Sequence, residues 1–287
     1  PHSPQHRHFG ETRAMYDDLN AALNWNAENP PWHGMVLIKD AAPTSEGTLL
    51  LHHFVSMHLR AERRVCLVGF EQALQHYSAV ARRFGVHLPA EAQAGRFTFV
   101  DGFSNPFSPA ATTPDQSVDL ERDPRSGLVN FSISLQSLES SVQQFTKLIS
   151  KIVRSDSSDC CIVIDGLSTF LDSASEMEEF LVADLLHYLR VLSKDPSLRC
   201  SVVVLAQAPP SPVPPLDRTI LSAEYMADTV MEVSPLTSGH SSAVHGQLLI
   251  RDGTQERDET LSEGGKMLQF KAKDNTVSFF PPGLFKS

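Results

Sequence analysis

The chain has 287 residues, 41% of them hydrophobic, and its 34 acidic and 24 basic side chains give a net charge of -10. This excess of acid argues against a generally basic nucleic-acid-binding protein, because neutralising phosphates requires clustered lysine and arginine, although a local basic patch stays open. The length is sufficient for one large domain or two small ones.

Targeting and redox signals point to an intracellular protein. No apolar run approaches the roughly 18 residues that span a membrane, and no charged-then-apolar leader is present. The cysteines lie in or beside apolar runs and form no CxxC pair, which is typical of small buried hydrophobes in a reducing compartment. These cysteines are Cys66, Cys160, Cys161 and Cys200. We therefore expect a soluble cytoplasmic protein with no membrane partner.

The first 30 residues are polar and predict a flexible tail (1–30) with a short helix near 15–23. His2, His6 and His8 could bind a metal, but nothing nearby completes a coordination set, so a solvated tail is the better interpretation. Residues 31–287 are predicted to form a single domain.

That domain begins with a strand, a turn and a helix. The run 35–38 is continuously apolar, as in a buried strand. Residues 40–47 have turn chemistry, and Thr44 or Ser45 can cap the helix that follows. In an α/β protein this turn is where a nucleotide phosphate is bound.

Short apolar runs then alternate with longer amphipathic segments. Strands are predicted at 64–70, 97–100, 160–164 and 201–206, and helices at 73–84, 135–153 and 177–192. Two proline-rich stretches interrupt the pattern: residues 102–130, predicted to be a surface loop, and the loop at 209–215. This alternation predicts an α/β fold with a mainly parallel sheet flanked by helices.

Four short strands without intervening helices end the chain. They are predicted at 229–233, 245–250, 267–271 and 276–280. We expect them to add an antiparallel extension to the parallel sheet.

The first turn is a degenerate phosphate loop. A Walker loop reads G-x-x-x-x-G-K-[ST], in which the lysine reaches the phosphates and the hydroxyl holds magnesium. With Gly47 as the second glycine, Ala42 stands at the first glycine, Thr48 at the lysine and Leu49 at the hydroxyl position. Shifting the register by one residue recovers no lysine. We therefore expect no ATP hydrolysis by this loop alone.

Three polar residues follow other predicted strands. Asp165 is at a Walker-B position, although an aspartate there more commonly caps the next turn or helix. Glu71 corresponds to the carboxylate that polarises water in RecA-type ATPases, and Gln207 to a γ-phosphate sensor. Together they outline the carboxyl edge of the sheet, where open α/β folds bind ligands.

Several strings resemble the subunit 6 family of the Elongator complex. The resemblance covers residues 51–88 (LHHFVSMHLRAERRVCLVGFEQALQHYSAVARRFGVHL), 244–250 (VHGQLLI) and 270–283 (FKAKDNTVSFFPPG), with 163–168 (VIDGLS) in agreement. It implies a RecA-like fold without a working Walker A motif, and hence no catalytic residues and no cofactor of its own.

The resemblance also implies partners and a cellular role. It implies a six-membered ring with Elongator subunits 4 and 5, two copies of each, which binds tRNA and attaches to the rest of the complex. That complex modifies wobble uridine at C5, and ATP hydrolysis by the ring promotes tRNA release. The expected locations are the cytoplasm and, in addition, the nucleus.

Two sets of basic residues are candidates for roles in such a ring. Lys271 and Lys273 resemble the trans-acting K-x-R pair of RecA-type rings, with Lys273 replacing the arginine; a solvated hairpin turn is the commoner interpretation. For tRNA, the loops expected to line a ring pore are 168–176 and 207–219, and they offer only Arg218. This chain is therefore expected to contribute little to RNA affinity.

Two other functions stay open. One is an active NTPase with an atypical phosphate loop, in which Asp165 and Glu71 hold magnesium and water. The other is a free-standing ligand-binding module at the sheet edge. A metal site is not expected, because His52 and His53 are adjacent on a helix and point about 100° apart.

Overall fold

The computed structural model describes residues 16–25, 30, 34–41, 46–108, 127–175, 178–208, 216–236, 239, 241, 244–253, 265–273 and 276–283. Four predictions concern residues outside these ranges: the tail histidines His2, His6 and His8, the loop position Ala42, the helix caps Thr44 and Ser45, and the proline-dense loop 209–215.

A ten-stranded sheet forms the centre of the molecule, in the order β12-β11-β10-β9-β1-β8-β7-β2-β3-β5. Its strands are β1 (Gly34–Asp40), β2 (Arg64–Gly69), β3 (Phe97–Asp101), β5 (Leu128–Asn130), β7 (Cys160–Ile164), β8 (Cys200–Gln207), β9 (Thr229–Ser234), β10 (Gly246–Asp252), β11 (Lys266–Lys273) and β12 (Thr276–Phe280). The seven strands from β9 to β5 pair in parallel. Strands β10, β11 and β12 add antiparallel pairs, which confirms the predicted extension.

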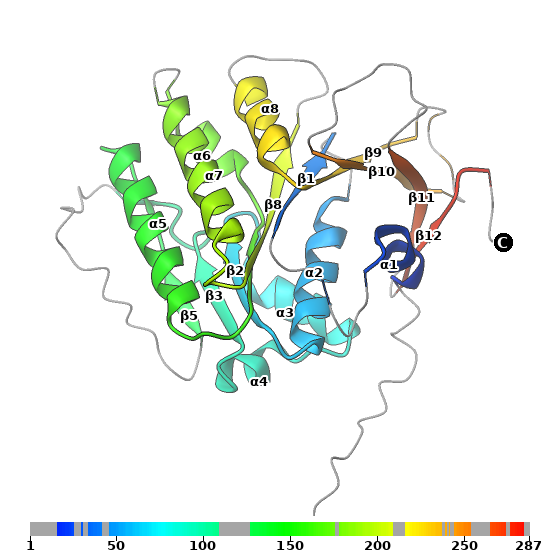
Figure 1. Ribbon diagram of the computed structural model, residues 1–287, viewed down its shortest axis with the longest axis horizontal. Coiled ribbons are helices and arrows are strands. Elements are labelled where there is room, and N and C mark those ends of the chain that lie inside the picture. The colour runs from blue at the N-terminus through cyan, green and yellow to red at the C-terminus, as the bar shows by residue number, and fades with distance from the viewer. Residues whose placement is uncertain are drawn as a thin grey trace, which may run out of the picture.

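Helices cover both faces of the sheet (Figure 1). They are α1 (Asp17–Leu23), α2 (Thr48–Arg60), α3 (Leu74–Arg83), α4 (Leu88–Gln93), α5 (Leu138–Arg154), α6 (Ser168–Asp172), α7 (Glu179–Lys194) and α8 (Leu216–Met226). Helices α1 to α4 pack on one face and α5 to α8 on the other, each group over its own core.

Strand β7 shows why the central strands read as continuous apolar runs. Its five residues are all buried. Cys160, Ile162 and Ile164 point into the core under α5 and α7, and Cys161 and Val163 into the core under α2. Side chains alternate between the faces of a strand, so a strand covered on both faces must be apolar throughout.

The N-terminal helix lies on the domain, although residues 1–30 were predicted to be a flexible tail. The Tyr16 ring stacks on His53 of α2 with centroids 4.1 Å apart, and its hydroxyl donates to the Leu49 carbonyl at 3.1 Å. Leu19 is fully buried. The described residues 16–25 therefore belong to the domain, a role that a seven-residue helix is too short to reveal in sequence.

Two predicted loops, 102–130 and 207–219, are wrong in part. Residues 128–130, within the predicted surface loop 102–130, form β5 and pair with β3. A small parallel sheet pairs β4 (Phe107–Ser108) with β6 (Ile133–Ser134). Helix α8 begins inside the segment predicted to be a loop through residue 219, and Gly47, not a hydroxyl residue, is the N-cap of α2. Within the described ranges, no helix is long and apolar enough to cross a bilayer.

Candidate functional site

The carboxyl edge of the sheet brings the predicted polar residues together. Strands β1, β8, β7 and β2 are neighbours. They end at or just before Asp40, Gln207, Asp165 and Glu71 respectively, and Asp40 is in register with Gln207. This is the edge at which parallel α/β sheets bind ligands.

Asp165 holds the turn between β2 and α3. Its Oδ1 accepts from the Phe70 N–H at 2.6 Å, and its Oδ2 accepts from the Gln72 N–H at 3.2 Å and the Tyr77 hydroxyl at 2.7 Å. The Glu71 N–H lies within reach of both oxygens. Burial raises the pKa of this carboxyl to about 6 although these donors oppose the rise. With both oxygens engaged by the protein, the arrangement fits a capping aspartate better than a magnesium ligand.

Glu71 lies half-buried beside the end of β7. A Cβ atom on Gly166 would come within 2.7 Å of its Oε1 and 2.6 Å of its Cγ, so a larger residue there would require the Glu71 side chain to move. Burial, and then the negative charge of Asp172, raise the pKa of the Glu71 carboxyl. The site therefore holds a carboxylate of raised proton affinity close to the edge, the kind of group that can accept a proton from water.

The start of α2 is occupied by a carboxylate of the same chain. Asp40, only 7% exposed, accepts a hydrogen bond from the Gly47 N–H through Oδ2 at 3.0 Å. A Cβ on Gly47 would lie 3.0 Å from that oxygen and 3.0 Å from the Leu205 side chain. Helix N-termini attract anions. Here the chain supplies the anion itself, and an incoming phosphate would meet a fixed negative charge.

A buried ion network engages Lys39, the lysine nearest to this turn, and no pattern in the sequence indicates it. Lys39 Nζ lies 2.6 Å from Glu224 Oε1 and 3.1 Å from Glu232 Oε2. Glu224 also pairs with Arg251. The network joins β1, α8, β9 and β10, and α8 was not predicted. Lys39 and Glu224 are both at most 5% exposed, so Lys39 acts here as a structural ion-pair partner.

The remaining predicted residues Gln207, Lys271 and Lys273 lie in strands of the sheet. The Gln207 side chain is exposed, while its N–H donates to Ser168 Oγ at 3.3 Å. Lys271 and Lys273 are within β11, opposite Ser278 and Thr276 of β12, rather than in a turn between strands. Strands β9 and β10 separate β11 from β1.

Arg218 is exposed, but on helix α8 rather than in a loop. Thr48 and Leu49, at the lysine and hydroxyl positions of the degenerate loop, form the partly buried first turn of α2. Strand β1 is thus followed by helix α2, as predicted, and a threonine stands at the lysine position.

The histidines of α2 serve packing. The His52 ring lies 5.3 Å from that of Tyr77, and His53 Nε2 is 2.9 Å from Asn20 Oδ1. Burial lowers the pKa of both to about 3. Across the described part of the chain, no three His, Cys, Asp or Glu side chains are grouped to hold a metal ion.

Solved structures share this fold. An uncharacterized protein from Pyrococcus horikoshii, crystallised with an unknown peptide, superposes with a TM-score of 0.62 at 14% identity, over 93% of this chain and 98% of that one. A KaiC-like protein from the same archaeon gives 0.51 at 13% identity, over 88% and 91%. These similarities confirm the RecA-like, mainly parallel α/β fold.

Relatives of known family are similar to this chain over most of its length. The Elongator complex protein 6 of Mus musculus is 26% identical over 94% of this chain and 98% of its own length. That of Danio rerio is 26% identical over 95% and 99%, and that of Homo sapiens 25% identical over 94% and 98%. A family model described as Elongation complex protein 6 matches residues 16–274. The chain therefore belongs to the Elongation complex protein 6 family.

Proposed function

We propose that this chain is a non-catalytic RecA-like subunit that assembles with Elongator subunits 4 and 5 into a heterohexameric ring. That ring binds tRNA and supports modification of wobble uridine at C5, in the cytoplasm and the nucleus. One observation carries the non-catalytic part: the Asp40 carboxylate accepts from the Gly47 N–H, at the place where a nucleotide-binding protein of this fold would bind phosphate.

The surrounding residues support the same conclusion. Both oxygens of Asp165 are engaged by the β2–α3 turn and Tyr77. Lys39 is held between two glutamates. Hydrolysis needs a cation near the γ-phosphate, and the residue at the lysine position of this loop is Thr48. What the chain retains is the shape of a RecA-like subunit.

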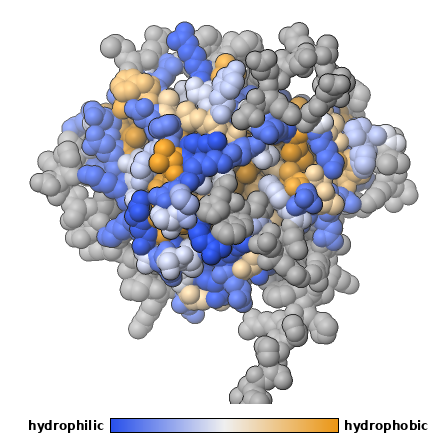
Figure 2. Space-filling view, viewed as in Figure 1, coloured by the Kyte–Doolittle hydropathy of each residue, from blue (hydrophilic) through white to orange (hydrophobic). Residues whose placement is uncertain are grey.

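Exposed apolar side chains on the surface are suited to subunit interfaces. Several large apolar side chains are exposed on α7 and α8, among them Phe180 at 60%, Leu221 at 39% and Tyr225 at 71%. Figure 2 shows hydrophobic residues breaking through a largely hydrophilic face in several places. Exposed apolar residues of this size are common at protein interfaces. We assign the burial of such surfaces to the neighbouring subunits.

Co-expression tests the proposal directly. The chain is produced with subunits 4 and 5, and the mass of the purified assembly is determined by native mass spectrometry. The expected result is a complex of two copies of each subunit. Recovery of this chain as a monomer that ignores both partners contradicts the proposal.

An active NTPase is the second candidate, favoured by Glu71, whose raised pKa suits a general base. ATP turnover by the isolated chain separates the two functions. A turnover rate that Glu71→Gln abolishes would establish the NTPase, whereas the absence of turnover in both proteins supports the non-catalytic subunit.

We also propose that basic residues of this chain act on a nucleotide bound by a neighbouring subunit. Lys271 and Lys273 lie in β11, which β9 and β10 separate from β1 in the sheet, and we assign them to a phosphate bound by a neighbouring subunit. Arg218 on α8 is the cation that we assign to tRNA. Both assignments concern the assembled ring and are tested in it.

A further inference from the structure

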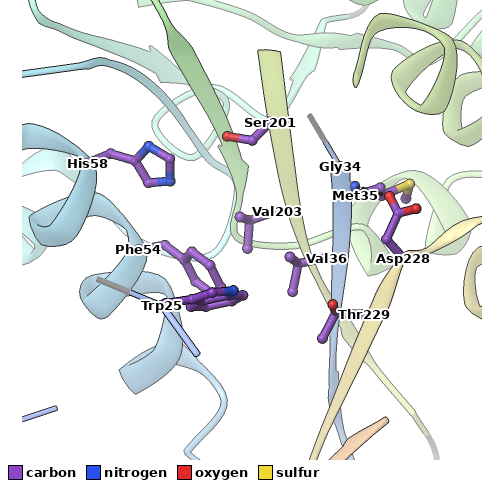
Figure 3. A pocket seen from close by; sticks show the side chains of 10 residues that line it. All are labelled: Trp25, Gly34, Met35, Val36, Phe54, His58, Ser201, Val203, Asp228 and Thr229. Carbon is purple, nitrogen blue, oxygen red and sulfur yellow. Dashed lines mark hydrogen bonds between the residues drawn. The ribbon is translucent and has the colours of Figure 1, made fainter. Parts of the chain in front are cut away.

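Cavities open at the amino edge of the sheet, opposite the degenerate loop. One, of about 120 Å3, lies between β1 and α2, where Trp25 is beside Phe54 (Figure 3). The carboxylate in its wall, Asp228, is engaged by Arg190 and Lys194, each at 2.7 Å. Another, of about 220 Å3, lies beneath the last turn of α5, at the starts of β2 and β7 and just before β3. Nothing in the proposed assembly function uses this α5 cavity.

Arg64 forms a fixed wall of the α5 cavity. Its guanidinium donates at 2.8–3.1 Å to four backbone oxygens at the end of α5 and just after it, those of Ile152, Val153, Asp156 and Ser158. It also donates to two serine hydroxyls. The last carbonyl groups of a helix have no partner within the helix. Arg64 satisfies them, and it brings a positive charge to the cavity that cannot move away.

Arg96 lines the same cavity with donors to spare. Its Nε donates to Glu91 Oε2 at 2.7 Å, and within the described part of the chain this is its one side-chain hydrogen bond. The Arg96 side chain is 36% exposed, so a ligand can reach it. The two terminal nitrogens form the flat end of the guanidinium, which matches the two oxygens of a carboxylate.

Thr98 adds a hydroxyl to the floor of the cavity. The residue is only 6% exposed, and its hydroxyl, which is open to the cavity, has no hydrogen-bond partner among the described residues. Buried hydroxyls in proteins are normally hydrogen-bonded. Arg96 and Thr98 are two residues apart in an extended segment, so both point to the face of the sheet that α5 covers. A single anion can therefore accept from both.

The charges around the cavity favour a monoanion. Two arginines and Asp156 line it, an excess of one positive charge in a chain whose net charge is -10. The Ser158 N–H, and then Arg64, lower the pKa of Asp156, so this balance holds at neutral pH. The other walls suit a hydrocarbon body, because they consist largely of the apolar side chains and thiols of Val65, Ile152, Cys66 and Cys160.

We propose that the α5 cavity binds a small aliphatic monocarboxylate. The carboxylate accepts from the terminal nitrogens of Arg96 and from the Thr98 hydroxyl, and the hydrocarbon body packs against Val65 and Ile152. An apolar cavity of about 150 Å3 holds benzene, so the volume here is sufficient for an acid of about four or five carbon atoms. The inference stands independently of the proposed assembly function.

Isobutyrate is the probe, added to the full chain carrying nitrogen-15-labelled glycine. The amide resonance of Gly95, which lines the cavity, should shift saturably, with a dissociation constant roughly in the millimolar range for so small a ligand. Gly95→Asn identifies this resonance, because asparagine tolerates the positive φ of 75° and nothing lies within 4 Å of an added Cβ. Isobutyramide, of the same shape without the charge, should bind at least about tenfold more weakly.

Two variants test the polar contacts separately. Thr98→Val keeps the side-chain shape without the hydroxyl, and Arg96→Lys keeps the charge without the bidentate contact. Each should weaken isobutyrate binding by about fivefold. Arg82→Lys, at an exposed arginine on α3, is the matched control and should bind as the parent chain does.

Thr98→Val is a small change, so it keeps the test decisive if Arg96→Lys does not fold. Three results overturn the proposal: no saturable shift of the Gly95 resonance, equal binding of isobutyramide, or binding by either folded variant that equals that of the parent chain.

Discussion

Three buried histidines on α2 should make the fold sensitive to mild acid. Burial lowers the pKa of His52, His53 and His58 from the ordinary 6.5 to about 3. Below pH 6.5 these histidines bind protons in the unfolded chain but stay neutral in the folded chain, so acid favours unfolding. The stability contributed by these neutral histidines is complete above pH 6.5 and is lost progressively as the pH falls toward 3.

The size of the effect follows from linkage. At about pH 5.5 each histidine removes RT ln 11, or about 1.4 kcal/mol, so the three together remove about 4 kcal/mol. Asp165 acts in the opposite sense, because its pKa is raised from 3.8 to about 6 in the folded state. As the pH falls, the folded chain therefore binds this proton before the unfolded chain does, which adds about 0.8 kcal/mol to the unfolding free energy at about pH 5.5. The net loss from about pH 7.5 to about pH 5.5 is roughly 3 kcal/mol, a large share of the roughly 5–15 kcal/mol that a domain has.

Urea unfolding of the chain at the two pH values measures this loss. His58→Leu should reduce the acid-induced loss of unfolding free energy by about 1.4 kcal/mol, because leucine has no proton to gain. His187→Gln, which removes an exposed histidine, should leave the loss unchanged. If the parent chain is equally stable at both pH values, or if His58→Leu loses as much as the parent, the linkage argument fails.

Three further substitutions test other contacts. Asp165→Ala should lower the unfolding free energy, measured in urea, by about 3 kcal/mol or more, because several buried donors lose their acceptor. Tyr77→Phe removes only one of these hydrogen bonds and should lower it by about 1 kcal/mol. Equal losses in the two variants would refute the capping role of Asp165. Lys39→Met should cost about 3–5 kcal/mol by leaving Glu224 buried beside Arg251 without its lysine, and adding Glu224→Gln should recover part of it in the same assay. Lys273→Ala should reduce ATP turnover by the co-expressed assembly without altering its mass; unchanged turnover would remove the proposed trans contact.

Much of the fold could be predicted because it rests on local pattern. Continuous apolar runs gave β2 and β7, and helical spacing gave α5 and α7, since burial on both faces or on one stripe leaves a direct trace in sequence. Helix α8 was missed because it directly follows a proline-dense segment. Strand β5 was missed because three residues are too few to show alternation.

The position of the candidate site could be predicted from the sequence, but the hydrogen bonds and ion pairs of its side chains could not. Strand ends and parallel topology place Asp165 and Glu71 at one edge. Whether an aspartate binds a metal or caps a turn depends on which donors reach it. The Tyr77 hydroxyl comes to Asp165 from 88 positions away, and Glu224 pairs with Lys39 from another layer of the fold. No periodicity encodes such pairings.

The contact between Asp40 and Gly47 has a thermodynamic consequence for the proposed ring. A subunit that binds ATP gains stability in proportion to the logarithm of the nucleotide concentration, so its folding follows the energy state of the cell. Here the anion at the start of α2 is covalently part of the chain and cannot dissociate or be diluted. The stability of this chain should therefore not depend on the nucleotide concentration, in energy-rich and energy-starved cells alike.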